Sequence, residues 1–401
     1  MSRKGKKPLI LIISNYYLPG IKSGGGTRTV VNTVDRLSDR YEFRIITRSY
    51  DAGEDKTRYS GVETGAWTQV GNAQVLYLDS DSDIRKVLPE ALEAFSPSLV
   101  YANSFFSPLT VRSLRLRRIG KLGEVPFLLA PCGELSSGAR KLKRIKKTIF
   151  ARTAVAGGLY DDIVWKASSE IEADEIRELR AQRKTIIVAP DLPPRTIFEE
   201  YSKERKLEKE RGKVNLVFLS RIDRKKNLKW LFDNLEIHEG SITLHVFGTI
   251  EDEEYYRQIE ESSMRTGIRF EYKGYLKHDR VPRELFRYHF KIMPTLGENF
   301  GHVFLEALAA GCPLLISDRT PWLDLEEKSA GWALPLETPK VWNKVIGKIV
   351  AMENEEYQAM SRASREYAEK FLSDPEIENA TVELFDFAIG SRHFPDKTAE
   401  A

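Results

Sequence analysis

Short hydrophobic runs alternate with helical patterns through the first half of the chain. In the intervening stretches apolar residues recur at intervals of three and four, as on one face of a helix. The predicted strands cover residues 9–14, 43–47, 75–78, 99–102, 127–130, 163–167 and 186–189, and helices are predicted from Thr27 to Leu37 and over 84–95 and 111–119. Uninterrupted apolar strands that alternate with helices are typical of a doubly wound parallel sheet with helices on both faces.

The same alternation starts again after residue 213. Predicted strands cover 214–219, 244–247, 268–272, 289–293 and 313–316. One helix is predicted to begin near Leu228, and others are predicted to cover 281–288, 303–311, 341–352, 357–371 and 375–389. A chain of 401 residues is too long for one ordinary core. We therefore predict two α/β domains.

The boundary between them falls at a proline-rich segment. Pro190-Asp191-Leu192-Pro193-Pro194 interrupts regular structure, and the charged residues 199–213 are predicted to form a solvated linker helix. The expected organisation is a first domain over 1–190, a linker over 191–213 and a second domain over 214–374. A last helix, at about 375–391, is expected to pack back on the first domain.

One strand, loop, helix and strand in the second half carries the densest chemical signal. Residues 289–316 form a βαβ pattern in which Gly297-Glu298-Asn299-Phe300-Gly301 lies between the first strand and the helix. That loop is at the carboxyl end of a parallel strand, where open α/β sheets bind ligands, and its backbone N–H groups suit a phosphate. Glu306 lies about one and a half turns inside the helix. A carboxylate against a diphosphate would be repelled, so sugar hydroxyls are better partners for Glu298 and Glu306. The alternative is a helix-capping Glu298 and a solvated Glu306.

Two cations follow the strand over 214–219. Arg221 can fork onto two phosphate oxygens and Lys226 supplies a compact charge, both at the carboxyl edge of the predicted sheet. Arg224 and Lys225 are interpreted as solvated neighbours.

A glycine run near the N-terminus has the same layout. Gly24, Gly25 and Gly26 lie between the first strand and a helix, where glycine permits close approach to a phosphate. A flexible surface turn explains the run equally well. The pattern is neither GxGxxG nor a P-loop, so NAD and ATP are poorly supported.

One acidic and one basic segment of the chain each allow two interpretations. Asp79-Ser80-Asp81-Ser82-Asp83 could hold magnesium or manganese, or could form a turn that caps the next helix. Residues 139–152 contain seven basic residues and no acid, although the whole chain carries a net charge of only +3. They predict a basic amphipathic helix, Arg140 to Arg152, for an anionic membrane surface or simply for solvent. No nucleic-acid-reading module accompanies the charge.

Two distant cysteines, Cys132 and Cys312, suit a reduced cytosol and indicate neither a disulfide nor a metal site.

The loop over 297–301 together with Glu306 resembles the Glu-x7-Glu signature of retaining glycosyltransferases of family 4, the group 1 transferases. The continuation through Ala309-Ala310-Gly311-Cys312-Pro313 to Thr320-Pro321-Trp322 is similar to bacterial surface-polysaccharide members. The resemblance implies a GT-B fold, in which two facing Rossmann-like domains enclose a cleft. It also implies a nucleoside diphosphate sugar as donor, with no other cofactor and no metal.

The resemblance further assigns roles to matching residues. Arg221 and Lys226 correspond to the diphosphate clamp, Glu298 to a contact with the donor sugar and Glu306 to a ribose contact. The remaining donor-binding positions implied are Asn299, Phe300, Gly301, Gly25, Gly26, Gly248 and Tyr275. The acceptor implied is a glycan or a lipid-linked sugar in cell-surface polysaccharide synthesis, such as lipopolysaccharide. Such an enzyme works in the cytoplasm, peripherally on the inner face of the plasma membrane.

Two departures from the family pattern keep other functions open. Many members have His-Gly or Arg-Gly where this chain has Cys132-Gly133, which removes a polar contact to the donor sugar. Asp191-Leu192 stands where a Pro-Asn-Gly hinge is frequent in the family. In the segment after Cys132, Glu134 is a candidate for a contact on the acceptor side. A nucleotide-sugar epimerase of the same fold and a non-catalytic membrane-associated nucleotide-sugar-binding protein are the rival functions.

Overall fold

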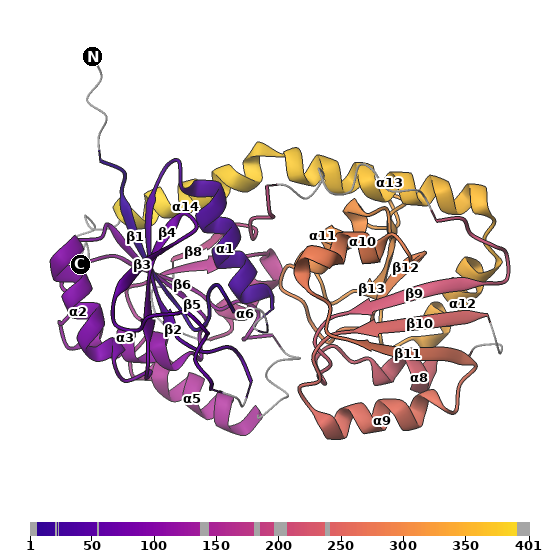
Figure 1. Cartoon of the computed structure of the whole chain (residues 1–401), viewed down its shortest axis with the longest axis horizontal. Coiled ribbons are helices and arrows are strands. Elements are labelled where there is room, and N and C mark those ends of the chain that lie inside the picture. The colour runs from indigo at the N-terminus through magenta and orange to yellow at the C-terminus, as the bar shows by residue number, and fades with distance from the viewer. Residues whose placement is uncertain are drawn as a thin grey trace, which may run out of the picture. The chain divides into compact units, whose positions relative to one another are not determined.

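The computed structural model describes residues 6–20, 22, 24–53, 56–136, 144–179, 185–195, 207–236 and 241–390, without the side chains of 144–147. The chain forms two compact units. The first contains residues 1–136, 143–195 and 375–401, and the second contains 137–142 and 196–374. Each is an α/β unit around a predominantly parallel sheet, as the alternation of strands and helices predicts (Figure 1).

The sheet of the first unit has eight strands in the order β3-β4-β2-β1-β5-β6-β7-β8. Their bounds are β1 Leu9–Ser14, β2 Glu42–Arg48, β3 Trp67–Val70, β4 Ala73–Leu78, β5 Leu99–Asn103, β6 Phe127–Ala130, β7 Val164–Ala167 and β8 Thr185–Val188. All neighbours pair in parallel except β3 with β4. The sequence pattern did not predict β3, because this short edge strand has no fully buried residue.

The helices of this unit are α1 Gly25–Leu37, α2 Ile84–Phe95, α3 Pro108–Arg118, α5 Arg144–Ala156, α6 Glu170–Arg177 and α14 Pro375–Gly390. α1 begins at Gly25 rather than near Thr27, so two of the three glycines belong to the helix. α14 packs on β5, and the Phe385 ring lies edge-on to Tyr41 with centroids 5.4 Å apart. The C-terminal helix thus completes the core of the unit formed by the N-terminal half.

The sheet of the second unit has six parallel strands in the order β11-β10-β9-β12-β13-β14. The strands are β9 Val214–Leu219, β10 Ile242–Phe247, β11 Ile268–Gly274, β12 Phe290–Met293, β13 Leu314–Ser317 and β14 Gly331–Leu334. The helices are α8 Lys229–Asn234, α9 Glu253–Ser263, α10 Val281–Leu285, α11 His302–Ala309, α12 Pro339–Ala351 and α13 Asn354–Ser373, with a 3-10 turn His278–Arg280. β14 was not predicted from the sequence.

The strand order reverses on the two sides of the β9–β12 pair. β10 and β11 extend the sheet on one side of β9, whereas β13 and β14 extend it beyond β12. The loops that leave two such strands at their carboxyl ends diverge to opposite faces, and open α/β sheets bind ligands in the crevice between them. The loops after β9 and β12 are those that carry the predicted site.

The predicted linker helix is wrong in its described part. Residues 207–213 contain no helix, and Lys209 is buried rather than solvated. Its ammonium donates hydrogen bonds to the carbonyls of Glu210, Val350 and Met352, at 3.0 to 3.3 Å. The aliphatic stem of a lysine can be buried when its charged end reaches carbonyl groups. The rest of the predicted helix lies outside the described residues.

In the described parts of the chain, no helix combines the length and the apolar character needed to cross a membrane.

Candidate functional site

Two loops meet at the carboxyl edge of the second sheet. One follows β9 and covers residues 220–228, and the other follows β12 and covers 294–301. The Leu296 N–H donates to the Lys225 carbonyl at 2.8 Å, and the Asn227 amide donates to the Pro294 carbonyl at 3.1 Å. These two hydrogen bonds fix the loops against each other and bring their charged side chains together.

Lys226 and Glu298 form an ion pair between the two loops. The Lys226 ammonium donates a hydrogen bond to Glu298 Oε2, and both side chains are largely shielded from solvent. Burial of the Glu298 carboxyl raises its pKa, but the charges of Lys226 and Lys225 outweigh burial and hold the pKa at about 2. Glu298 is therefore ionised at neutral pH, and it is neither a helix cap nor a solvated residue.

Arg221 lies at the start of the loop after β9. Its guanidinium donates to both carboxylate oxygens of Glu251, at 2.9 and 3.0 Å, and lies 3.9 Å from Asp223. The side chain retains 40% of its exposure, so the outer side of its fork can reach a ligand. Glu251 follows β10, so three strand ends contribute to this cluster.

Gly248 allows the loops after β9 and β10 to pass in close contact. Its φ is 147°, and a Cβ atom there would lie 1.8 Å from the Ser220 carbonyl oxygen. The Tyr272 hydroxyl donates to the Gly248 carbonyl at 2.8 Å. Only glycine fits this position, and it determines where the backbone leads into Arg221. Tyr275, one residue after β11, is 42% exposed at the same end of the sheet.

The loop after β12 ends at the N-terminus of α11. Gly301 has a φ of 79° and stands directly before the helix, where a Cβ atom would clash with the Phe304 ring. Phe300 is buried, and its carbonyl accepts a hydrogen bond from the Trp322 indole at 2.6 Å. The buried ring of Phe300 and the hydrogen bond to its carbonyl thus anchor the loop. The Phe300 ring is part of the core, and its donor-binding role stays a prediction.

Glu306 has a partner that sequence reasoning missed. The His278 imidazole lies 3.0 Å from Glu306 Oε1, and the Glu306 side chain is 9% exposed. His278 stands in the 3-10 turn after β11, far from Glu306 in the chain. No periodic pattern connects the two residues, so only the fold could reveal the pair. The solvated Glu306 of the alternative interpretation is excluded.

A buried lysine lies beneath the cluster and was also missed. Lys291 in β12 has no exposed surface, and its ammonium donates to the Leu219 carbonyl at 2.9 Å, at the end of β9. Burial lowers its pKa from 10.5 to about 7. Lys291 thus ties β12 to the carboxyl end of β9 through an amine whose pKa is about 7.

We expect Lys291→Met to stabilise the protein and to remove a pH dependence. Between pH 7 and 10.5 the unfolded chain holds a proton on Lys291 that the folded chain releases, so the free energy of unfolding rises with pH in this window. The slope is at most about 1.4 kcal/mol per pH unit. Thermal unfolding midpoints at pH 7, 8 and 9 measure it, with the exposed Lys344→Met as the control. Equal slopes in wild type and Lys291→Met would contradict the buried amine's role.

The first unit carries its own polar cluster at the carboxyl edge of its sheet. The Asn103 amide, at the end of β5, donates to the Gly26 carbonyl at 2.9 Å and accepts a hydrogen bond from the Cys132 thiol. Gly25 and Gly26 therefore begin α1 in a hydrogen-bonded position, and only Gly24, with a φ of 68°, requires glycine. The flexible surface turn is a wrong interpretation for Gly25 and Gly26. They belong to a different unit from Arg221 and Lys226.

Glu134 organises a loop in the first unit. Its carboxylate accepts hydrogen bonds from the Ser104 hydroxyl at 2.9 and 3.0 Å and from the Phe106 N–H at 2.9 Å. These contacts hold the loop after β5 against the loop after β6. The contacts give Glu134 a structural task, whereas its acceptor-side role stays a prediction.

The aspartates over 79–83 are engaged by the protein itself. Asp81 accepts two hydrogen bonds from Arg48, at 2.7 and 2.8 Å, Asp79 pairs with Arg58, and the Asp83 carboxylate accepts from the Ser80 N–H. The segment is a turn, although Asp83 makes no side-chain cap to α2. Among the described residues, no group of three or more His, Cys, Asp or Glu is placed to hold a metal ion.

The predicted basic helix is described only in part. α5 covers Arg144–Ala156, whereas Arg140, Lys141 and Lys143 lie outside the described residues, as do the side chains of Arg144, Lys146 and Lys147. Within the described part, Ile149 is 58% exposed and Phe150 is half-buried. Ile149 therefore faces outward rather than into the core.

The architecture is that of the GT-B glycosyltransferases. Sucrose-phosphate synthase from Thermosynechococcus elongatus superposes with a TM-score of 0.68 over 96% of this chain and 100% of that chain, at 15% identity. WaaG, a glycosyltransferase involved in lipopolysaccharide biosynthesis, gives 0.63 over 95% and 100%, at 13% identity. Anabaena HepE in complex with UDP-glucose gives 0.64 over 95% and 99%, at 15% identity. The GT-B expectation is thus confirmed.

Two sequence comparisons indicate which glycosyltransferases the chain is similar to. Residues 199–367 match the family model of the group 1 glycosyl transferases. An uncharacterized 41.2 kDa protein in the cps region of Klebsiella pneumoniae is 19% identical over 371 residues, which is 90% of this chain and 96% of that protein. With the GT-B fold, the match supports a group 1 glycosyltransferase.

Proposed function

We propose that the protein is a retaining glycosyltransferase of family 4 that moves a sugar from a nucleoside diphosphate sugar to a glycan or lipid-linked acceptor in cell-surface polysaccharide synthesis. One observation carries the proposal. Lys226, Arg221 and the ionised Glu298 converge at the switch point of the second sheet, beside the N-terminus of α11. The Klebsiella relative from a cps region and the lipopolysaccharide enzyme WaaG support the polysaccharide context.

The cations of the cluster suit a departing diphosphate. As the bond from the sugar to the diphosphate breaks, negative charge grows on the bridging oxygen, and fixed positive groups stabilise that charge most effectively. An ammonium has three N–H donors, of which Lys226 uses one for Glu298. The remaining donors, the Arg221 guanidinium and backbone N–H groups at the N-terminus of α11 would hold the phosphate oxygens. The N–H groups of Gly297 and Glu298 already donate to the Thr295 hydroxyl and to the Arg319 carbonyl.

The two carboxylates would position the donor. Glu298, held ionised by Lys226, would accept hydrogen bonds from hydroxyl groups of the donor sugar. Glu306 would accept from the ribose, next to the His278 imidazole. Gly248, Tyr275 and Asn299 would complete the part of the donor site that the second unit supplies. HepE, the structural neighbour that was solved with UDP-glucose, supports a UDP-sugar as the first donor to test.

The reaction proceeds without a general base from the protein in this proposal. The acceptor hydroxyl attacks the anomeric carbon on the face that the diphosphate leaves, its proton passes to a diphosphate oxygen, and the anomeric configuration is retained. Because Lys226 and Arg221 supply the positive charge, we also propose that turnover is independent of divalent metal and resists chelation. Proton NMR of the product distinguishes retention from inversion.

Donor binding gives the direct test. A cognate nucleotide sugar at one hundred times its Kd should stabilise the protein by about 2.7 kcal/mol, which thermal unfolding against a panel of nucleotide sugars detects. Glu306→Ala should lose that shift, whereas Glu366→Ala, on the exposed face of α13, should keep it. Conversion of the nucleotide sugar without an acceptor would instead indicate an epimerase, and absence of any shift across the panel would refute donor binding.

A further inference from the structure

The contact between His278 and Glu306 joins two separate elements of the second unit. His278 begins the 3-10 turn that follows β11, and Glu306 lies in the middle of α11. His278 Nε2 lies 3.0 Å from Glu306 Oε1. No other side chain in the described part of the chain forms an ion pair or a hydrogen bond with this carboxylate. A buried acid therefore depends on one imidazole.

The core of the unit fixes the turn that carries His278. α10 follows this turn directly, and its residues Val281 and Leu285 are buried. α10 packs on α11, where Leu305 and Leu308 belong to the same hydrophobic core. The place of the imidazole beside the carboxylate is therefore determined by the packing of two helices and not by a long flexible side chain.

Glu306 can bind a ligand while it contacts His278. A carboxylate has about four lone-pair sites, so one imidazole leaves acceptor capacity for hydroxyl groups. The His278 side chain is 41% exposed and the Glu306 side chain keeps 9% of its exposure, so this pair lies at the edge of the interior. A glutamate that is free to rotate loses rotamer entropy when a ligand binds it, and a partner that orders it beforehand lowers this cost.

From this geometry we propose that His278 is a positioning residue for Glu306 and sets the preference of the donor site for ribose over deoxyribose. The inference rests on the proposed function, in which Glu306 accepts a hydrogen bond from the ribose. His278 holds Oε1 through a proton on Nε2, which a neutral or a charged imidazole can supply. Oε2 then keeps one orientation toward a ribose hydroxyl. A nucleotide without that hydroxyl leaves the oriented carboxylate without its ligand partner and binds more weakly.

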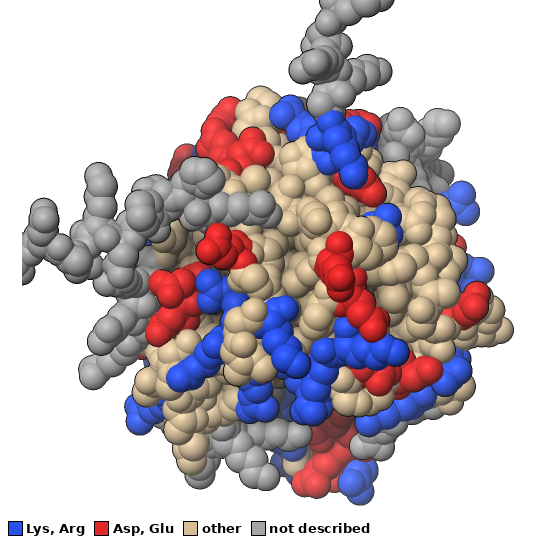
Figure 2. All heavy atoms as spheres, turned by 90° about the vertical axis from the view of Figure 1, so that its left-hand side faces the viewer, with Lys and Arg blue, Asp and Glu red and all other residues tan. Residues whose placement is uncertain are grey.

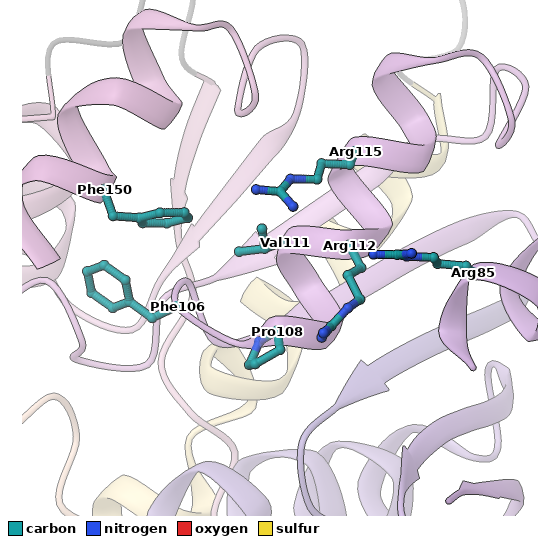
Figure 3. A pocket seen from close by; sticks show the side chains of 7 residues that line it. All are labelled: Arg85, Phe106, Pro108, Val111, Arg112, Arg115 and Phe150. Carbon is teal, nitrogen blue, oxygen red and sulfur yellow. The ribbon is translucent and has the colours of Figure 1, made fainter. Parts of the chain in front are cut away.

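A basic cavity in the first unit is a second place where a diphosphate could bind. In Figure 2, which faces the side of this unit where α2 and α3 lie, Lys and Arg side chains gather across the lower part of the surface. The cavity encloses about 290 Å³, and Figure 3 shows two phenylalanine rings on one side of it and the guanidinium groups of Arg85, Arg112 and Arg115 on the other. No carboxylate is among the residues that line it. Phosphate can bind there, but no carboxylate is present to accept from a ribose.

Calorimetric titration of the full chain tests the inference. The ligands are UDP, GDP and ADP, each with its 2′-deoxy and 3′-deoxy form. Wild type should bind the ribonucleotide about tenfold more tightly than the form that lacks the hydroxyl held by Glu306. His278→Phe keeps a ring without an N–H, and it should weaken the ribonucleotide about fivefold to tenfold and remove most of the preference.

Two further variants separate positioning from a merely structural role. His278→Gln should restore the preference, because its amide nitrogen donates from a place close to that of Nε2. In a Glu306→Gln background, His278→Phe should cause no further loss of affinity, since residues that act through each other are not additive. A purely structural His278 would lower the unfolding midpoint and weaken the ribonucleotide and the deoxyribonucleotide alike.

Two control variants locate the effect. His245→Phe removes another imidazole of the second unit that lies near a carboxylate, 3.4 Å from Glu271, and should leave the preference unchanged. Arg85→Gln/Arg115→Gln removes two charges from the cavity of the first unit and should leave the Kd unchanged. Loss of nucleotide binding in this double variant would assign the nucleotide to that cavity and overturn the inference.

The remaining outcomes distinguish the inference from the proposed function. Nucleotide binding with an unchanged ribose preference in His278→Phe, or with no preference in wild type, would overturn the inference and leave donor binding intact. If wild type binds none of the nucleoside diphosphates, the proposed function and the inference are overturned together.

Discussion

Lys226→Ala is expected to lower the turnover number by about 10² to 10³ with little change in folding, the range found when one preorganised donor to a developing negative charge is removed. Lys226 points from the loop after β9 to Glu298 on the loop after β12, so its ammonium occupies the meeting point of the two loops. The loss should lie in kcat rather than in KM, because the charge on the diphosphate oxygen grows only as the sugar departs. Steady-state transfer with the cognate donor measures both constants.

Two further variants show whether the loss has this cause. Lys229→Ala removes the same side chain three residues later, from a surface pair with Asp233, and should leave kcat unchanged. Lys226→Ala also leaves the Glu298 carboxylate without its partner, and this charge alone could repel a diphosphate. The double variant Lys226→Ala/Glu298→Gln removes the repulsion. Recovery of near-normal kcat in the double variant would show that Lys226 only neutralises Glu298 and does not act on the diphosphate.

The central strands were predictable because they are buried on both faces. β1, β6 and β9 have the predicted bounds, since an uninterrupted apolar run between turn residues has few other folds available. β3 was missed because its residues are partly exposed and carry no apolar alternation. The failed linker helix has a different cause. A charged segment predicts solvent exposure. Lys209 is nevertheless buried, because three carbonyl groups accept hydrogen bonds from its ammonium.

The sequence could predict the residues of the candidate site that lie in loops after parallel strands. Arg221, Lys226 and Glu298 lie in loops that follow parallel strands, and parallel strands bring their carboxyl ends to one edge. Their partners were not predictable. Glu251, His278 and Lys291 contribute contacts that depend on loop paths and on the interior of the sheet, and nothing in their local sequence sets them apart. A tertiary contact between short polar segments leaves no periodic signal in one sequence.

The two departures from the family pattern have structural explanations in the first unit. The Cys132 thiol donates to Asn103, which in turn donates to the first turn of α1, so Cys132 links the loop after β6 to the glycine run. Burial raises the pKa of this thiol well above its usual value, which keeps it protonated as a donor. The position that is often histidine or arginine in the family therefore supports the loop here. Asp191, at the position of the expected hinge, is buried and paired.

Asp191→Ala is expected to destabilise the first unit by about 3 to 5 kcal/mol, the cost of leaving one member of a buried ion pair without its partner. The Asp191 carboxylate accepts from the Lys166 ammonium at 2.6 Å and from the Thr29 hydroxyl at 2.9 Å, and all three side chains are buried. Burial lowers the pKa of Lys166, but Asp191 outweighs burial and keeps that pKa above its usual value. Without Asp191, Lys166 must either lose its proton or remain charged in the interior. The thermal unfolding midpoint should fall by on the order of 10 °C.

The surface pair of Asp39 with Arg195 provides the matched control. These residues lie 3.3 Å apart with Asp39 81% exposed, so Asp39→Ala should change stability by less than about 1 kcal/mol. The double variant Lys166→Met/Asp191→Leu replaces the buried pair by apolar side chains of similar size and should recover most of the stability. Thr29 keeps an acceptor in the Gly25 carbonyl at 3.2 Å. If the double variant is as unstable as Asp191→Ala, the loss comes from the shape of the Asp191 side chain and its hydrogen bonds. If it recovers, the cost of Asp191→Ala is that of an unpaired lysine beneath the start of α1.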